Sequence, residues 1–360
     1  MKAKKVQGRS ERTTRACLVA VGGAKGGVGK SMFATNLAVH LARTGSRTVV
    51  VDLDLGGANQ HLYLGHRALL ASTMNDFVKG RARTLAEVTV DTRYGPKLIG
   101  GNSSELGSAN LTHGRKIKML RAIRDIDADY VILDLGGDTS YNIVDCFNLA
   151  DFGIVVSTRE SASYVGAYQF IKIALYRKLQ RAFGTESRFA AERDLDLERI
   201  LKGLTSAEGA NGRSIAALVE DVRAQAPASL PLLTRILDYF RPYLVTNRIP
   251  QGFDVSALVR SLQDVMQRWL SKDVRHLGTV TAQREIEASA IELVPVLAKH
   301  PTGLMAKELA HIAERLAAQA RPDGRAPLED EVDPADVLEE IVVAARARAG
   351  SPAERLWDSC

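Results

Sequence analysis

Cysteine is scarce in this chain of 360 residues, with only Cys17, Cys146 and Cys360, and the three stand far apart. They suggest no disulfide framework and no paired metal or cluster ligands, which disfavours a stapled mini-domain and an iron–sulfur carrier. Long hydrophobic runs are also missing: no stretch approaches the roughly 18 apolar residues that a spanning helix needs. The first residues are basic but no apolar segment follows them, so no secretory signal peptide is expected. These absences predict a protein of the reducing cytoplasm.

The composition is that of a globular protein, with 46% hydrophobic and 25% charged residues. The net charge of +6 is unevenly spread. Residues 1–15 hold six basic side chains and one acidic one, whereas residues 319–360 hold five arginines and ten carboxylates. We therefore expect a flexible basic N-terminal segment at 1–15 and an acidic tail at 319–360. The basic segment is either simply solvated or binds nucleic acid, anionic lipid or the tail.

Short β-branched runs alternate with longer helical patterns, which is typical of βαβ units and a parallel sheet. The runs are continuously apolar, as strands buried on both faces are. The expected strands are 17–21, 48–51, 130–133, 153–157, 243–246 and 277–280. Helices are expected between them, for instance over 31–43 and 115–124. The predicted fold class is α/β, with a doubly wound, mostly parallel sheet flanked by helices.

One stretch, residues 184–241, is polar, rich in arginine and longer than a simple crossover needs. Apolar residues recur at helical spacing over 215–222. We interpret the stretch as a helical insertion within one domain at 16–318, serving either as a partner surface or as filler on the domain flank. The tail composition predicts an end to the ordered fold, with one further helix over 334–349.

The most informative segment is GGAKGGVGKS, from Gly22 to Ser31, between an expected strand and an amphipathic helix. Phosphate oxygens need backbone N–H donors at close range, which glycines permit because they lack a Cβ and tolerate positive φ. The next helix points its N-terminal N–H groups at the same anion. Lys30 would supply charge to the β and γ phosphates, and the Ser31 hydroxyl would ligate Mg²⁺. The segment predicts a P-loop, with an ordinary glycine turn as the alternative. Its predicted nucleotide-binding residues are Gly26, Gly27, Val28, Gly29, Lys30, Ser31 and Met32.

A second lysine, Lys25, stands inside the loop, where an ordinary P-loop requires none. The run KGGVGKS, from Lys25 to Ser31, resembles the deviant Walker A motif of the MinD/ParA family of P-loop ATPases. The resemblance implies a P-loop ATPase fold, ATP and Mg²⁺ as cofactors, and a homodimer in the ATP-bound state. It also implies that Lys25 reaches the nucleotide held by the partner subunit. A solvated loop lysine is the alternative.

Three carboxylates stand at expected strand ends: Asp52 and Asp54 after residues 48–51, and Asp134 after residues 130–133. Ligands of doubly wound sheets collect at such strand ends, and an apolar strand ending in a carboxylate is typical of a Walker B element. The resemblance implies that Asp54 orients the attacking water. The predicted catalytic residues are Lys25, Lys30 and Asp54, and the predicted metal site comprises Ser31, Asp52 and Asp134. A helix cap is the alternative for either segment alone.

Asn247 and Arg248 end a late strand. The resemblance implies that Asn247 hydrogen-bonds adenine with Arg248 beside it, although the pair alone is typical of a turn. The backbone of Gly136–Gly137 is expected to sense the γ-phosphate as a second switch. Asp138 departs from the family, whose members carry a small residue there. Positioning and charge neutralisation do most of the work in phosphoryl transfer, so turnover is expected to be slow until dimerisation or a protein partner completes the site.

Within the family, the wording of residues 52–59, 129–137 and 141–151 resembles the FlhG (FleN) branch, whose members regulate flagellar number and placement. The implied function is an ATP-switched dimer that positions or counts a cellular assembly. A ParA-like segregation ATPase, carried on DNA by Arg177, Arg181 and Arg188, is an alternative. A non-hydrolysing regulator that binds ATP and docks on a transcription factor is another.

The branch also implies reversible membrane docking by a C-terminal amphipathic helix, and hence a peripheral place at the inner membrane or cell pole. In this chain one face of the helix expected over 334–349 is apolar, with Val337, Leu338, Ile341, Val342 and Ala345, but acidic residues flank it. Anionic lipid would repel that polar face. A packing or partner-binding helix is therefore the alternative.

Overall fold

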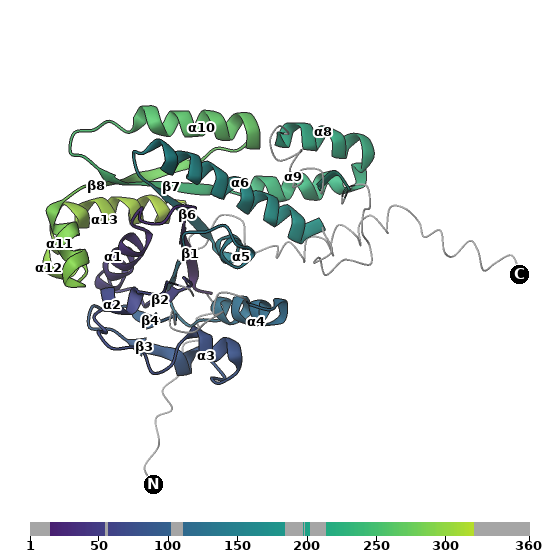
Figure 1. Ribbon diagram of the computed structural model, residues 1–360. Coiled ribbons are helices and arrows are strands. Elements are labelled where there is room, and N and C mark those ends of the chain that lie inside the picture. The colour runs from purple at the N-terminus through teal and green to yellow at the C-terminus, as the bar shows by residue number, and fades with distance from the viewer. Residues whose placement is uncertain are drawn as a thin grey trace, which may run out of the picture.

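A single eight-stranded sheet forms the centre of the molecule, with the strand order β3-β4-β2-β5-β1-β6-β7-β8 (Figure 1). This computed structural model describes residues 15–54, 57–101, 111–183, 197, 199–201 and 214–319. The strands are β1 (Cys17–Gly22), β2 (Thr48–Asp52), β3 (Thr89–Asp91), β4 (Lys97–Ile99), β5 (Tyr130–Asp134), β6 (Phe152–Ser157), β7 (Pro242–Ile249) and β8 (Arg275–Thr281). Every neighbouring pair is parallel except β3 and β4. The predicted α/β class and mostly parallel sheet are confirmed.

All six expected strands are present, with ends that differ from the expectation by one to a few residues. The sequence analysis missed β3 and β4, an antiparallel pair at one edge of the sheet. Each has only three residues, which is too short for a periodic pattern of burial to show in the sequence.

Helices cover both faces of the sheet. One face carries α1 (Lys30–Arg43), α2 (Gln60–Tyr63), α11 (Arg284–Glu292), α12 (Val296–Lys299) and α13 (Leu304–Ala317). The other carries α3 (Met74–Lys79), α4 (His113–Arg124), α5 (Tyr141–Leu149), α6 (Ser161–Phe183), α8 (Ile215–Gln225), α9 (Leu230–Tyr239) and α10 (Ser256–Leu270). In β1, Leu18 and Ala20 join the second core while Val19 and Val21 join the first. Because successive side chains enter opposite cores, the strand reads as a continuous apolar run.

The helices α8 and α9 lie within the stretch predicted to be an insertion. In α8, Ile215, Leu218 and Val222 are buried, and the helix begins where Ser214 Oγ accepts the N–H of Ala217. This helix contacts α9 and α10, and α9 contacts α6. The rest of the chain therefore covers the apolar face of α8. The boundaries of the insertion and of the domain stay predictions.

The arginines proposed as DNA contacts require a correction. Arg177 is only 4% exposed and donates from Nε and Nη2 to Asp145, at 2.8 and 3.0 Å, while Lys116 donates to the same carboxylate at 2.5 Å. The prediction that Arg177 is a surface cation was wrong, because this side chain is a buried counter-ion. Arg181 lies 3.9 Å from the same carboxylate. Arg188 lies outside the described residues, as do 1–14 of the basic segment, 320–360 of the tail and the helix expected over 334–349.

Among the helices that the structure describes, none has the length and apolarity that crossing a membrane would require.

Candidate nucleotide site

The glycine-rich loop joins β1 to α1 at the carboxyl edge of the sheet. Strand β1 lies between β5 and β6. The chain leaves β1 toward α1 on one face, whereas it leaves β5 toward α5 on the other. This reversal of direction opens a crevice beyond the strand ends, where ligands bind in doubly wound sheets. The predicted P-loop therefore occupies the ligand-binding position of the fold.

A cavity of about 600 Å³ opens over this loop. Gly27 and Gly29 adopt left-handed backbone conformations, with φ of 78° and 93°. A Cβ at Gly26 or Gly27 would meet no atom within 4 Å, so both backbones border open space. The predicted residues that line the cavity are Gly26, Gly27, Gly29, Lys30, Ser31, Met32, Asp54, Asn247 and Arg248. The predicted residues that do not line it are Lys25, Val28, Asp52 and Asp134.

Lys30 reaches inward from the first turn of α1 and is only 7% exposed. Its ammonium donates to the carbonyl oxygen of Lys25 at 3.1 Å. Burial lowers the pKa of Lys30, against the opposing pull of Asp134, Asp54 and Asp138. A Cβ at Gly137 would lie 3.2 Å from Nζ, so the loop after β5 also touches this side chain. Lys30 therefore carries a desolvated positive charge at the base of the cavity.

Asp52 and Asp134 are paired residues at the ends of the parallel strands β2 and β5, and each is 1% exposed. Asp52 accepts the backbone N–H groups of Asn59 and Gln60, both at 3.0 Å, and of Asp54 at 3.3 Å. Asp134 Oδ1 is buried without a hydrogen-bond partner. Burial raises the pKa of both carboxyl groups, and Asp134 adds to the shift at Asp52. Two desolvated carboxylates with an unpartnered oxygen fit a hard divalent cation such as Mg²⁺.

Gln60 is a buried residue of this site that the sequence analysis did not single out. Its Nε2 donates to Asp134 Oδ2 at 2.8 Å and to the Ser31 carbonyl at 3.1 Å, and its Oε1 accepts from Thr35 at 2.7 Å. Against the effect of burial, the Ser31 side chain acts on the same carboxylate and lowers its pKa. Gln60 thus ties α1 to the end of β5. Its only signal in the sequence is an amide following the glycines after Asp54.

The Asp54 carboxylate lies among glycines. A Cβ at Gly57 would lie 3.0 Å from its Oδ2, and one at Gly136 would lie 3.3 Å from its Oδ1. Asp54 therefore lies beside both the loop after β2 and the loop after β5. It also lines the cavity.

The Lys25 side chain does not line the cavity and is bound to Glu160 instead. Its Nζ donates to Glu160 Oε2 at 2.8 Å, and the two side chains are 43% and 65% exposed. This hydrogen bond lowers the pKa of Glu160. The two lysines of the loop therefore have different surroundings, since Lys30 is buried in the cavity and Lys25 is held at the surface.

Asn247 and Arg248 hold the loop from the end of β7. Asn247 Nδ2 donates to the carbonyl of Val28 at 2.8 Å, and its Oδ1 accepts the N–H of Arg248 at 2.9 Å. Arg248 has a positive φ of 57° and donates to the carbonyl of Gly27 at 3.0 Å. The Val28 side chain itself is in the core, so only its backbone faces these residues. The adenine role of Asn247 stays a prediction.

The sequence analysis also missed a second group of residues that line the cavity. They come from the start of α11 and the residues before it, including Gln283, Ile286 and Glu287, and from α2, which contributes Tyr63. Only the general rule that loops after parallel strands carry ligand sites would have indicated these residues.

This chain belongs to the CobQ/CobB/MinD/ParA (CbiA) nucleotide binding domain family, whose sequence model matches residues 19–289. It is 30% identical over 158 residues to the antiactivator FleN of Pseudomonas aeruginosa, covering 43% of this chain and 55% of FleN. It is 29% identical over 160 residues to the flagellum site-determining protein YlxH of Helicobacter pylori, covering 43% and 52%. The chain thus spans about half the length of the curated relatives it matches. The predicted resemblance to the MinD/ParA family is confirmed.

Solved structures share the fold. The septum site-determining protein MinD of Pyrococcus horikoshii, complexed with Mg-ADP, aligns with a TM-score of 0.55 at 16% identity, over 83% of this chain and 95% of that one. A chain of the MinC:MinD cell division protein complex of Aquifex aeolicus aligns with a TM-score of 0.56 at 15% identity, over 85% of this chain and 98% of that one.

Proposed function

We propose that this chain is an Mg²⁺-dependent ATPase that dimerises around ATP and uses that switch to set the position or number of a cellular assembly such as the flagellum. The observation that carries the proposal is the contrast between two lysines on one glycine loop. Lys30 is buried beneath the cavity, whereas Lys25 is exposed and lies outside its lining. One cation would serve the nucleotide of its own subunit and the other that of a second subunit.

The partner of Lys25 supports this role. Its ion pair with Glu160 is solvent-exposed, and such pairs contribute little to stability. Lys25 can therefore exchange Glu160 for a more highly charged phosphate at small cost. Arg248 and Arg159 lie near Glu160 and would help to keep this carboxylate satisfied after the exchange.

The chemistry assigned to the cavity is phosphoryl transfer to water. The glycine backbone and Lys30 would hold the phosphates, and Asp54 would orient the attacking water. Ser31, Asp52 and Asp134 would hold Mg²⁺, directly or through its water shell, and the ion would neutralise charge on the phosphate oxygens. Lys25 of the second subunit would complete the site, so the isolated chain is expected to turn over slowly.

The proposed cellular role rests on the relatives. FleN is named an antiactivator and YlxH a flagellum site-determining protein, and MinD relatives of similar identity are named septum site-determining proteins. A cytoplasmic protein that is recruited to the inner membrane or a cell pole fits these names. The identity of the assembly and of the protein partner is part of the proposal.

The size of the protein in solution tests the switch. We expect a monomer with ADP and a dimer with ATP, and we expect Lys25→Ala to abolish the shift while leaving ATP binding intact. Lys307→Ala, an exposed lysine of α13 away from the loop, serves as the control and should dimerise normally. An oligomeric state that ignores the nucleotide in all three proteins would refute the switch.

Hydrolysis is tested with Asp54→Ala. If the chain is an ATPase, this variant should dimerise with ATP but release phosphate much more slowly than the unsubstituted protein. Absence of phosphate release from both proteins would instead favour a regulator that binds ATP without hydrolysing it, and equal measurable release would show that Asp54 does not orient the attacking water.

The DNA-segregation alternative has lost one of its surface residues, because Arg177 is a buried counter-ion. Salt-dependent binding of plain duplex DNA by the ATP form would revive it, whereas flotation with liposomes would support membrane recruitment.

A further inference from the structure

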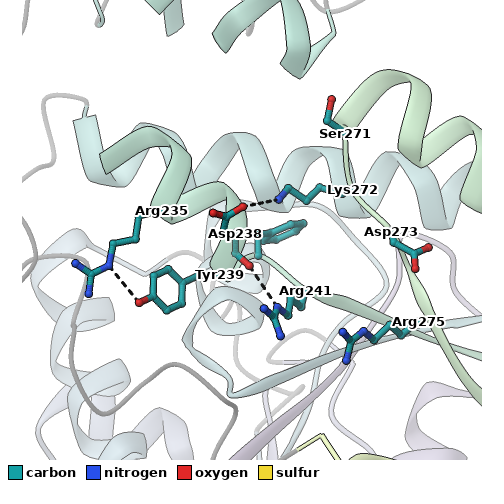
Figure 2. A pocket seen from close by; sticks show the side chains of 9 residues that line it. Arg235, Asp238, Tyr239, Arg241, Ser271, Lys272, Asp273 and Arg275 are labelled. Atoms are coloured by element: carbon teal, nitrogen blue, oxygen red, sulfur yellow. Dashed lines mark hydrogen bonds and ion pairs between the residues drawn. The ribbon is translucent and has the colours of Figure 1, made fainter. Parts of the chain in front are cut away.

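A second cavity, of about 520 Å³, lies at the opposite edge of the sheet from the nucleotide site. Its lining includes Arg241, just before β7 begins, and Arg275, the first residue of β8. The P-loop follows the carboxyl end of β1, and these strands run parallel, so the two cavities occupy opposite strand ends. The remaining lining comes from the last turns of α9 and the segment after α10 (Figure 2). We call this cavity the basic pocket.

Cations outnumber carboxylates in the basic pocket. Arg235, Arg241, Lys272 and Arg275 line it with Asp238 and Asp273. The cations have weak or neutral partners. Arg235 donates to the Tyr239 hydroxyl at 3.1 Å, Arg241 donates to the carbonyl of Asp238 at 3.3 Å, and Lys272 lies 4.0 Å from the Asp238 carboxylate.

Within the described ranges, none of the three guanidinium groups forms an ion pair with a carboxylate. The guanidinium groups of Arg241 and Arg275 lie on the same side of the pocket in Figure 2. A guanidinium carries five N–H donors, and each of these uses one on its neutral partner. The free donors fit carboxylates, which arginine binds in bidentate geometry.

The described part of the chain ends beside this pocket. Arg275 donates to the side chain of Gln319, the last described residue after α13. Ten residues further on, the segment 329–340 holds seven carboxylates and no lysine or arginine. A connection of ten residues spans up to about 33 Å, so the segment can return to the pocket at which the described chain ends.

We propose that the acidic segment 329–340 docks in the basic pocket of the same molecule. Its carboxylates would pair with the guanidinium groups of Arg235, Arg241 and Arg275. The short tether raises the effective concentration of the segment at the pocket, so weak individual pairs suffice. Docking would hold the apolar face expected over 337–345, which begins within the docked segment, against the edge of the sheet remote from the nucleotide.

The test uses the full-length chain with Arg275→Lys, which keeps the charge and adds an amine. A carbodiimide couples amines to carboxylates in contact, and mass spectrometry identifies the joined peptides. We expect position 275 to couple to 329–340 of the same molecule, about tenfold more than position 260 does in Arg260→Lys, an exposed control on α10. Coupling should fall about tenfold in 0.5 M salt, where the Debye length is only about 4 Å.

A second measurement uses the full chain in which all seven carboxylates of 329–340 are replaced by amides. This variant should bind a fluorescent peptide of sequence 327–342 about tenfold more tightly than the unsubstituted protein, whose own tail competes. The additional change Arg241→Glu should remove that binding. Equal coupling at positions 275 and 260, or equal peptide binding by the two chains, would overturn the proposal. Coupling confined to crosslinked dimers would show instead that a second copy fills the pocket.

Discussion

Two buried clusters of charged side chains, one around Asp134 and one around Asp145, are built in opposite ways although these two aspartates are only eleven residues apart in the chain. At the end of β5, Asp134 lies opposite Asp52 in the register of the parallel strands β5 and β2. One carboxylate oxygen of Asp134 has no hydrogen-bond partner. In the middle of α5, Asp145 accepts hydrogen bonds from Lys116 of α4 and Arg177 of α6. The first cluster has an excess of negative charge, whereas the second surrounds one carboxylate with cations.

The pKa shifts follow this difference. Burial raises the pKa of Asp52 and of Asp134. Burial acts in the same direction on Asp145, but the hydrogen bonds from Arg177 and Lys116 outweigh it and leave its pKa below the ordinary value. A carboxyl group whose charge is disfavoured needs a cation from outside, while one that is already neutralised holds helices together. The first cluster therefore fits a bound cation, whereas the second holds helices together.

The largest expected effect is the loss of stability when the second cluster loses its carboxylate. Asp145→Asn removes the carboxylate shared by two buried cations and should destabilise the fold by about 3–5 kcal/mol, because an uncompensated buried charge is left behind. Urea unfolding measures this loss. Asp273→Asn, a substitution at an exposed aspartate, should stay within about 0.5 kcal/mol of the unsubstituted protein. Equal stability of Asp145→Asn and the control would show that the cations do not depend on Asp145.

The next effect concerns Lys30, whose pKa is lowered by burial and pulled upward by Asp134 of the first cluster. Lys30→Met should weaken ATP binding about tenfold to a hundredfold, since a charge-assisted hydrogen bond contributes about 1.5–3 kcal/mol. Stability should change little, because methionine replaces an ammonium that is desolvated in the fold. Calorimetric titration with ATP checks the affinity, with Lys307→Met as the matched control. Unchanged affinity would mean that the cavity over the P-loop is not the nucleotide site.

The two clusters also differ in how far the sequence predicts them. Asp52 and Asp134 were found because a carboxylate directly after an apolar strand is a local pattern, and the topology brings parallel strand ends together. Asp145 and Arg177 are 32 residues apart, on helices whose pairing leaves no local trace. Arg177 was consequently interpreted as a surface cation.

Gln60 and the cavity-lining residues at the start of α11 were harder to predict than Asp52 and Asp134 but easier than the pairing of Asp145 with Arg177. Each follows a strand at the ligand edge of the sheet, but no spacing rule identifies the side chain that turns inward. Glu160 was missed for the same reason as Arg177, since its partner Lys25 is 135 residues away. Local chemistry was predictable in this chain, whereas the partners of charged side chains were not.

A smaller effect separates the two carboxylates of the first cluster. Asp134→Asn should stabilise the ligand-free fold by about 1 kcal/mol, because it removes a buried charge with an unpartnered oxygen and relieves repulsion from Asp52. Asp52→Asn should gain less, since Asp52 accepts three backbone N–H groups. Urea unfolding without nucleotide compares the two. If Asp134→Asn is less stable than Asp52→Asn, the unpartnered oxygen of Asp134 does not destabilise the ligand-free fold.

The smallest effect is the pH dependence of the second cluster. Because the pKa of Asp145 is depressed in the fold, its stabilisation is complete above the pKa of the unfolded chain, about 3.9, and is lost as the pH falls through the folded value. The stability difference between the unsubstituted protein and Asp145→Asn should therefore stay constant from pH 7 to pH 5 and shrink below about pH 4. Urea unfolding at several pH values measures this difference. A difference that grows on acidification would mean that Asp145 is not held ionised by its cations, and the contrast between the clusters would fail.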